Sequence, residues 1–239
     1  MIHLSSLRLI LKFLHSITIY YNLLKGKENK DNNIDIMKEY IELKSVIRED
    51  IPRIINWLNN DEVIDNWFGR YTYGEPAHLG YEPEKMIDAN ENEWNEVFHD
   101  PHHEPHRSIF SIYVGKTHLG EAQLSIDESL GDAQISILIG DPANWHKGYG
   151  TQTAVALLEH IFVHLNLHRA WVDIPEYNTK AYKMFEGLGF SHEGTLRKSR
   201  PHKGSRHNSY IMGVILDEYN EKFSDIDIQS HVIEWDNPL

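Results

Sequence analysis

The segment from Ala133 to Leu165 decides the fold and reads AQISILIGDPANWHKGYGTQTAVALLEHIFVHL. Its first seven residues are dense in apolar side chains, which predicts a buried strand. The Gly-Asp-Pro that follows ends the strand. A helix is expected from Gly148 to Leu165, because apolar residues recur there at i, i+3 and i+7. The segment therefore predicts a strand, a loop and a helix in direct succession.

The loop of this segment carries two glycines, in the run Trp145-His146-Lys147-Gly148-Tyr149-Gly150. Glycines one residue apart let a backbone turn tightly and approach a ligand without a clash from Cβ. The first N–H groups of a helix have no partner within it, and with the helix dipole they form an anion site. A pyrophosphate suits such a site. A Gly-x-Gly before a helix is equally typical of a tight turn without a ligand.

Outward from this segment, strands and helices alternate along the chain. Strands are expected at 40–46, 108–114, 119–126, 169–174, 190–195 and 208–215. Asp50 is expected to cap a helix that carries Pro52 in its first turn. Further helices are expected at 83–98 and at 178–188, the latter ended by Gly189. This order predicts a mixed α/β fold whose front half is largely antiparallel.

Composition and charge exclude several kinds of function. The 239 residues contain no cysteine, which rules out disulfides, thiolate metal sites and a cysteine nucleophile. Its absence fits a reducing compartment, and a cytoplasmic protein is expected. A net charge of −13 disfavours nucleic-acid binding. Such a charge favours a cationic, amine-bearing partner, although solubility alone also explains it.

Three regions are expected: an N-terminal extension (1–36), a domain (37–220) and an acidic, peripheral tail (221–239). His3 to Leu24 reads as an amphipathic helix, because Arg8 and Lys12 share one face. Charges interrupt it too soon for a membrane span, and it lacks a cleavage site of a signal peptide. Residues 25–33 form a polar linker. The extension is either an appended N-terminus without function or a membrane-surface helix.

The loop resembles the cofactor motif of the GNAT superfamily of N-acetyltransferases, Gln/Arg-x-x-Gly-x-Gly/Ala. Its glycines match Gly148 and Gly150, and Trp145 takes the Gln/Arg position, as is common in the RimJ/RimL-like branch. Three more stretches resemble that family at the expected spacing, namely 56–63, the Asn-x-x-Ala…Gly-Phe block at 178–190, and 210–219. The resemblance implies the GNAT fold, in which a mostly antiparallel sheet, flanked by helices, splays between its fourth and fifth strands. It implies an acetyl-CoA-dependent N-acetyltransferase without a metal.

The resemblance also implies where acetyl-CoA binds. The backbone of Ile137, Leu138 and Ile139 is expected to pair with the pantetheine arm, since GNAT strands part there. The pyrophosphate is expected on the loop and first helical turn, formed by Trp145, His146, Lys147, Gly148, Tyr149, Gly150 and Thr151. Lys147 either adds charge near phosphate or is a solvated lysine. Asn178 is expected to face the pantetheine, to cap the helix that it opens, or both.

The catalytic groups are harder to assign. Many GNAT enzymes protonate the departing thiolate with a tyrosine seven residues after the asparagine, but Phe185 stands there. Tyr182 lies on roughly the same helical face and is the candidate acid; the alternative is a packing tyrosine. Some relatives carry a serine three residues after the asparagine, where this chain has Ala181. Glu121 is the candidate base, and strand alternation could equally place it in solvent.

The resemblance implies that the acceptor is a primary amine and leaves open whether it belongs to a protein N-terminus, a polyamine or an aminoglycoside. The protein is expected to be a monomer or a homodimer. Aromatic residues between the first helices are expected to form the acceptor groove or simply to pack, namely Trp67, Phe68, Tyr71, Tyr73 and Tyr81.

A basic patch is formed by Arg197, Lys198, Arg200, Lys203 and Arg206. It is expected to contact the 3′-phosphate of CoA, an acidic acceptor segment, or neither. The histidines at 99, 102, 103 and 106 are expected in a polar loop rather than a zinc site, because two prolines break the helix that would align them. The alternative to an enzyme is a non-catalytic acyl-CoA-binding module.

Overall fold

The computed structural model describes residues 40–70, 80–99 and 106–223. Its strands are β1 (Ile41–Ser45), β2 (His106–Val114), β3 (Thr117–Asp127), β4 (Asp132–Ile139), β5 (Arg169–Pro175), β6 (Ser191–His202) and β7 (Ser205–Ile215). Its α-helices are α2 (Ile51–Leu58), α3 (Asp61–Asn66), α4 (Pro83–Met86), α5 (Glu91–Phe98), α6 (Tyr149–Glu159), α7 (Thr179–Gly187) and α8 (Leu216–Phe223). Short turns are η1 (Arg48–Asp50), η2 (Pro142–Asn144) and the π-helical η3 (His160–His164). The extension at 1–36 lies outside the described residues.

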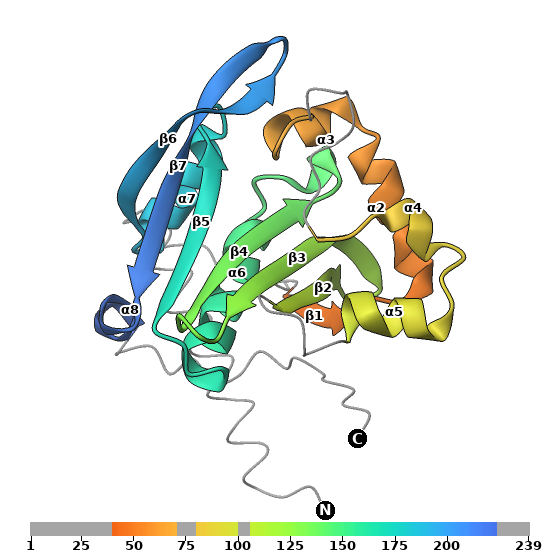
Figure 1. Ribbon diagram of the computed structural model, residues 1–239, viewed down its shortest axis with the longest axis horizontal. Helices are drawn as coiled ribbons and strands as arrows, with labels where there is room; N and C mark the ends of the chain where they lie inside the picture. Colours follow the sequence, from red (N-terminus) through yellow and green to blue (C-terminus); the bar gives the residue numbers. More distant parts are fainter. Residues whose placement is uncertain (1–39, 71–79, 100–105, 224–239) are drawn as a thin grey trace, which may run out of the picture.

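The strands form one seven-stranded sheet in the order β1-β2-β3-β4-β5-β7-β6 (Figure 1). All neighbouring pairs are antiparallel except β4 and β5, which are parallel. Two strands that run parallel need a crossover, and α6 supplies it. The mixed α/β fold predicted from the sequence is confirmed.

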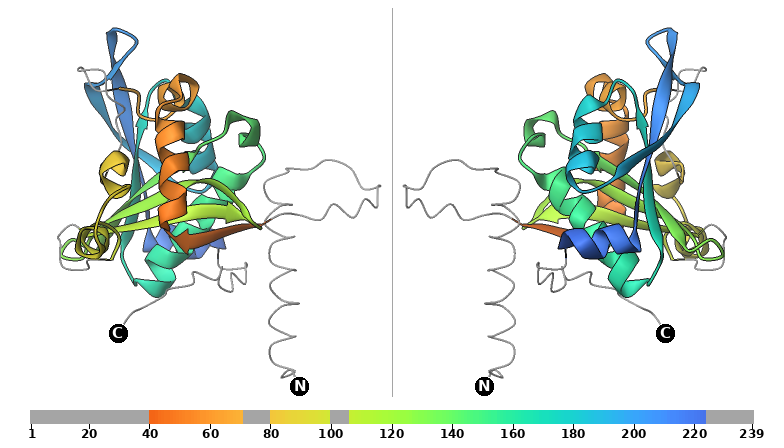
Figure 2. Two further views of the ribbon diagram at one scale, coloured as in Figure 1. Left: turned by 90° about the vertical axis from the view of Figure 1, so that its right-hand side faces the viewer. Right: turned by 90° about the vertical axis from the view of Figure 1, so that its left-hand side faces the viewer.

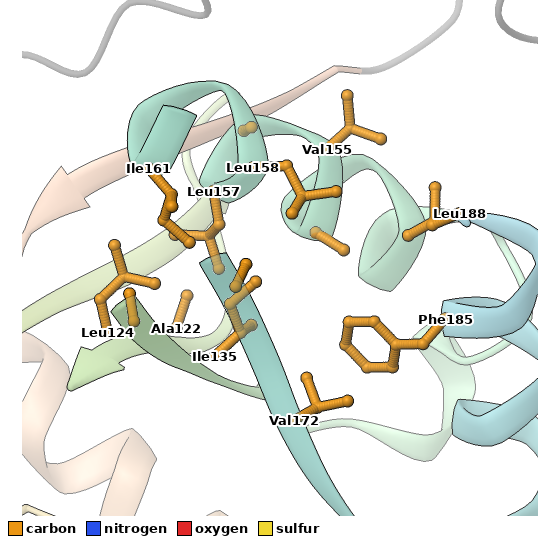
Figure 3. Packing of buried hydrophobic residues seen from close by; sticks show 14 of the residues in the cluster. Ala122, Leu124, Ile135, Val155, Leu157, Leu158, Ile161, Val172, Phe185 and Leu188 are labelled. Carbon is orange, nitrogen blue, oxygen red and sulfur yellow. The ribbon is translucent and has the colours of Figure 1, made fainter. Parts of the chain in front are cut away.

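Each face of the sheet has its own hydrophobic core. On one face, α6 and α7 pack on side chains such as Leu124, Ile135 and Val172 (Figure 3), and α8 adds Tyr219 and Phe223 to the same cluster. On the opposite face, α2 to α5 gather a second cluster around Ile54, Trp57 and Trp94, with Leu138 from β4. Because successive strand residues point to opposite faces, β4 contributes to both clusters. Strand β4, which begins the segment that decides the fold, therefore joins the two cores.

Several elements differ from their predicted bounds. The helix expected at 83–98 is divided into α4 and α5, because Asn90 starts a new helix with Glu93 in a capping box. The strand expected to end at 195 continues as β6 to His202. Helix α8 runs to Phe223, past the domain end expected at 220, and buries Tyr219 against Phe162. No helix of the described residues is long and apolar enough to span a membrane.

Asp50 does not cap α2 with its side chain, as the sequence had suggested, but is buried at 0% exposure. Its carboxylate accepts hydrogen bonds from Tyr113 Oη (2.5 Å), Arg53 Nη2 (2.5 Å) and Ser111 Oγ (2.6 Å). Burial raises the pKa of this carboxyl, but the hydrogen bonds from Ser111 and Tyr113 outweigh it and leave the pKa below its usual value. The charge therefore ties the start of α2 to β2.

His160, at the junction of α6 and the π-helix, is expected to make the protein less stable in mild acid. Its side chain is 2% exposed, and burial, together with His164, lowers its pKa to about 4. Between pH 6.5 and about 4, the unfolded chain binds a proton that the folded chain does not, so stability falls as pH falls. From pH 7 to pH 5 this contribution is about 2 kcal/mol. Urea unfolding of wild type and His160→Leu at both pH values would measure it.

The matched control is His192→Leu, which makes the same replacement at an exposed histidine of β6. It is expected to keep the wild-type loss of stability between pH 7 and pH 5, whereas His160→Leu loses about 2 kcal/mol less. Equal losses in wild type and His160→Leu would show that His160 does not titrate in this way.

Candidate active site

Strands β4 and β5 run side by side at one end and part toward the other (Figure 1). The two strands pair only through Asp132–Gln134 and Arg169–Trp171. Beyond these residues lies a cavity of about 320 Å³ that is also lined by the start of α6, by α7 and by the end of α3. The expected splay between the fourth and fifth strands is thus present.

The peptide groups of β4 that face this cleft can be assigned from the ladder with β3. Gly140 N donates to Leu119 O at 2.8 Å, and antiparallel pairing alternates along a strand. The backbone groups of Ile137 and Ile139 therefore face away from β3, into the cleft. Trp145 Nε1 already donates to the carbonyl of Ile139 at 2.8 Å, which leaves both groups of Ile137 and the N–H of Ile139 for a ligand.

Leu138 differs from its neighbours and corrects the expectation that its backbone would pair with the pantetheine. Its carbonyl points to β3, where a Cβ on Gly120 would lie 2.0 Å from that oxygen. Its side chain still lines the cleft from the face of the second core.

The loop before α6 is shaped as an anion site. Gly148 has φ +88°, in the left-handed region that glycine adopts without strain, and no atom lies within 4 Å of the Cβ that a larger residue would carry. Gln152 N is bonded to Gly148 O, so the N–H groups of Tyr149, Gly150 and Thr151 lie ahead of the intrahelical ladder. His146 has φ +62°.

Two lysines flank this helix start. Lys147 is exposed and donates from Nζ to Asn144 Oδ1 at 3.0 Å. Lys180, which sequence analysis did not single out, reaches from α7 to lie 2.7 Å from His146 Nε2 and lines the cleft. It lies 34 residues away from that histidine in the chain, so no local pattern could have revealed the contact. Both cations strengthen the positive field of the helix start.

Asn178 links two walls of the cleft. Its Oδ1 accepts from Ala181 N at 3.1 Å, which caps α7 as expected. Its Nδ2 donates to the carbonyl of Asn66 at 2.7 Å, which fixes the end of α3. The next two residues, Trp67 and Phe68, line the cleft as the sequence suggested. Asn178 thus joins the start of α7 to the end of α3.

The model of the family described as "Acetyltransferase (GNAT) domain" matches residues 41–191, well over half of the chain. The chain belongs to the GNAT acetyltransferase family. That family consists of acetyl-CoA-dependent N-acetyltransferases, as the resemblance implied.

Individual relatives of this GNAT chain are distant. It is 27% identical over 161 residues to the spermidine N(1)-acetyltransferase of Vibrio cholerae, covering 67% of this chain and 84% of that protein. It is 31% identical over 113 residues to an uncharacterised N-acetyltransferase, p20, of Bacillus licheniformis, covering 46% of this chain and only 63% of that one. The structure of the Vibrio cholerae spermidine N-acetyltransferase with CoA and spermine matches at a TM-score of 0.59 and 24% identity, covering 75% and 97% of the two chains. The RimJ/RimL-like branch stays a prediction.

The position of the common GNAT acid is held by Phe185, which lines the cleft with its ring edge-on to Phe190 at 4.9 Å. Tyr182 is not among the residues that line the cleft. Its ring packs edge-on against Tyr210 at 5.5 Å and lies 6.2 Å from His192. Tyr182 thus packs on β6 and β7 beside Ala181, which lines the cleft, and its role as the acid stays a prediction.

Glu121 also lies outside the lining of the GNAT cleft. It is buried on β3, where Oε2 accepts from Tyr81 Oη at 2.5 Å and Oε1 accepts from Gln123 Nε2 at 2.6 Å. Burial, together with the Glu121 charge, raises the pKa of Tyr81 well above its usual value, so this phenol stays protonated as the donor. Tyr81 packs on Phe98 rather than facing the cleft.

The basic patch is partly neutralised. Arg200 of β6 forms an ion pair with Asp173 of β5, and Lys203 Nζ lies 2.9 Å from Asp65 of α3. The second pair ties the tip of the β6–β7 hairpin to α3, and the tip and α3 lie at one end of the molecule in Figure 2. Four of the residues singled out from the sequence lie outside the described residues, namely Tyr71, Tyr73, His102 and His103. The described residues contain no group of side chains suited to a metal.

Proposed function

We propose that this chain transfers the acetyl group of acetyl-CoA to a primary amine of a polyamine, by direct attack in a ternary complex. The observation that supports it most is the cleft between β4 and β5, which has a helix N-terminus at one end and unpaired peptide groups along one side. Such a cleft fits a long donor that carries a pyrophosphate and amides.

The residues of the cleft suit each part of acetyl-CoA in turn. The N–H groups of Tyr149, Gly150 and Thr151 would bind the pyrophosphate, with Lys180 and Lys147 adding positive charge. The C=O of Ile137 and the N–H of Ile139 would pair with the amides of the pantetheine arm, as a neighbouring strand would. Trp145 fixes the carbonyl of Ile139, so that the loop holds its shape before the donor arrives.

The reaction then needs little further chemistry from the protein. The neutral amine attacks the thioester carbonyl carbon, a C–N bond forms, and the C–S bond breaks. The CoA thiolate takes up a proton, and the amine gives up one proton to solvent. The peptide N–H of Ile137 faces the cleft and would stabilise the oxyanion. Because Phe185 cannot donate a proton, we assign protonation of the thiolate to water.

A polyamine is favoured over the other acceptors by charge. The chain carries −13, which attracts a polycation and speeds its encounter. The relatives named as spermidine acetyltransferases support the same class. The oligomeric state stays a prediction.

Calorimetry with acetyl-CoA, followed by a thiol-release assay with a panel of amines, tests this proposal. Spermidine is expected to stimulate CoA release at least about tenfold more than an N-terminal peptide or an aminoglycoside at equal concentration. Faster release with the peptide would move the acceptor to a protein N-terminus. If acetyl-CoA does not bind, the proposed function is wrong.

The second candidate is an acyl-CoA-binding module without turnover, and the phenylalanine at 185 is the observation that favours it. It predicts acetyl-CoA binding without CoA release for any amine of the panel.

A further inference from the structure

Two buried polar atoms in the cleft have no hydrogen-bond partner among the described residues, namely Ser136 Oγ and Asp173 Oδ1. Ser136 is 8% exposed, and the side chain of Asp173 is 12% exposed. Both residues line the cleft. Since nearly all buried polar atoms in proteins are paired, two unpaired acceptors in one cavity point to a ligand that donates hydrogen bonds.

The two residues occupy equivalent positions on neighbouring strands. Gln134 and Trp171 form the last pair between β4 and β5, and Ser136 and Asp173 each follow two residues later. Because side chains alternate along a strand, both point to the same face of the sheet, on either side of the opening. It is the face of Leu138 and of α2 to α5, opposite the one that α6 and α7 cover.

Asp173 is held so that one oxygen remains available. Its Oδ2 accepts from Arg200 Nη2, and the Arg200 guanidinium lies over the ring of Phe68, 4.9 Å from its centroid. Phe68 in turn lines the cleft. The arginine therefore fixes the carboxylate, and the free Oδ1 can accept a charge-assisted hydrogen bond.

We propose that Ser136 and Asp173 bind the reacting nitrogen of the acceptor amine. This inference rests on the proposed function. From Ile139 back to Ser136, β4 rises about 10 Å, which places the pair deep along the arm of a donor anchored at α6. A neutral primary amine has two N–H groups and one lone pair. With one hydrogen on Ser136 Oγ and the other on Asp173 Oδ1, the lone pair is left for the thioester carbon.

The pair therefore selects primary over secondary amines, because a secondary amine offers a single N–H. On spermidine, the two terminal nitrogens react and the central one does not. The substrate class is a cationic chain with an unsubstituted amino end that can enter between Phe68 and the parted strands.

Steady-state kinetics with spermidine test this inference through Ser136→Ala and Asp173→Asn. Asp173→Asn is expected to raise KM for spermidine at least about tenfold, the cost of one hydrogen bond to a charged group, and Ser136→Ala about fivefold, the cost of one between neutral groups. Affinity for acetyl-CoA, measured by calorimetry, is expected to stay within about twofold. Ser136→Thr keeps a hydroxyl and is expected to restore a KM within about threefold of wild type.

The matched control is Asp132→Asn, which alters a carboxylate–arginine pair that joins β4 to β5. Asp132 Oδ2 lies 3.4 Å from Arg169 Nη1, at the closed end of the cleft, and this variant is expected to keep the wild-type KM. Melting temperatures are measured for every variant. If Asp173→Asn fails to fold because Arg200 loses its partner, Ser136→Ala and Ser136→Thr decide the result.

A KM for spermidine within twofold of wild type in Ser136→Ala, with normal acetyl-CoA binding and turnover, would overturn the inference while leaving the proposed function standing. A wild type that binds no acetyl-CoA, or releases no CoA with any amine, would overturn both.

Discussion

Replacing Gly148 by tryptophan is expected to weaken acetyl-CoA binding by at least about 100-fold. A side chain there extends into the open space ahead of α6, because no atom lies within 4 Å of its Cβ position. That space is where the N–H groups of the first turn point, so an indole would occupy the place of the pyrophosphate. The φ of +88° adds about 1 kcal/mol of strain for any residue other than glycine. Calorimetric titration of wild type and Gly148→Trp measures the loss.

Two further variants separate bulk from strain. Gly148→Ala carries the strain with little bulk and is expected to bind acetyl-CoA no more than about tenfold more weakly. Gly115→Trp places the same side chain at another glycine of positive φ with free space around it, in the turn between β2 and β3, and is expected to bind as wild type does. Wild-type affinity in Gly148→Trp would show that the loop is a turn and not the donor site.

Asp50→Ala is expected to lower the free energy of unfolding by about 3–5 kcal/mol, the usual cost of removing one partner from a buried ionic network. It leaves Arg53, Tyr113 and Ser111 without their common acceptor. Such a loss is a large part of the stability of a typical domain, and urea unfolding measures it. The exposed Asp88→Ala is the control, with an expected change within about 0.5 kcal/mol.

The stability lost in Asp50→Ala is expected to depend on pH. Because the folded-state pKa of Asp50 lies below its usual value, its contribution is present above about pH 4 and is lost as pH falls through the folded-state pKa. The difference between wild type and Asp50→Ala should therefore shrink in acid. A constant difference would mean that Asp50 acts by packing and not by charge.

Disruption at Asp50 is also expected to reach the donor loop. Helix α2 carries Trp57, and its ring fills the space beside Gly140, where a Cβ would lie 1.9 Å from the indole. Gly140 ends β4 immediately before the loop. Variants that loosen α2 should therefore weaken acetyl-CoA binding, although they lie far from the cleft in sequence.

Local features of this chain were predictable from its sequence, because local residues determine them. The strand, the loop and the helix from Ala133 onward followed from apolar spacing and two glycines. Asn178 followed from its place before a helix. The break between α4 and α5 was also readable, since Asn90 and Glu93 form a capping box, but the apolar pattern on both sides concealed it.

Contacts between distant segments were not predictable. The hydrogen bond from Asn178 to Asn66 spans 112 residues. Ser136 and Asp173 reach equivalent positions only through the register of two strands joined by a crossover. Tyr182 shared a helix with Asn178, which suggested a common face. A difference of one position sent its ring toward Tyr210 instead. Sequence periodicity sets which residues share a helix face only approximately, and a catalytic assignment needs the neighbouring strands.

The short junction between β4 and β5 has a consequence for the whole molecule. Three pairs of residues join the half of the sheet that contains β1 to β4 to the half that contains β5 to β7. A donor lying between the strands would act as a missing strand that bridges both halves. By mass action, acetyl-CoA at 100 times its dissociation constant would add about 2.7 kcal/mol to the free energy of unfolding. The lifetime of the folded enzyme would then follow the supply of the substrate that it consumes.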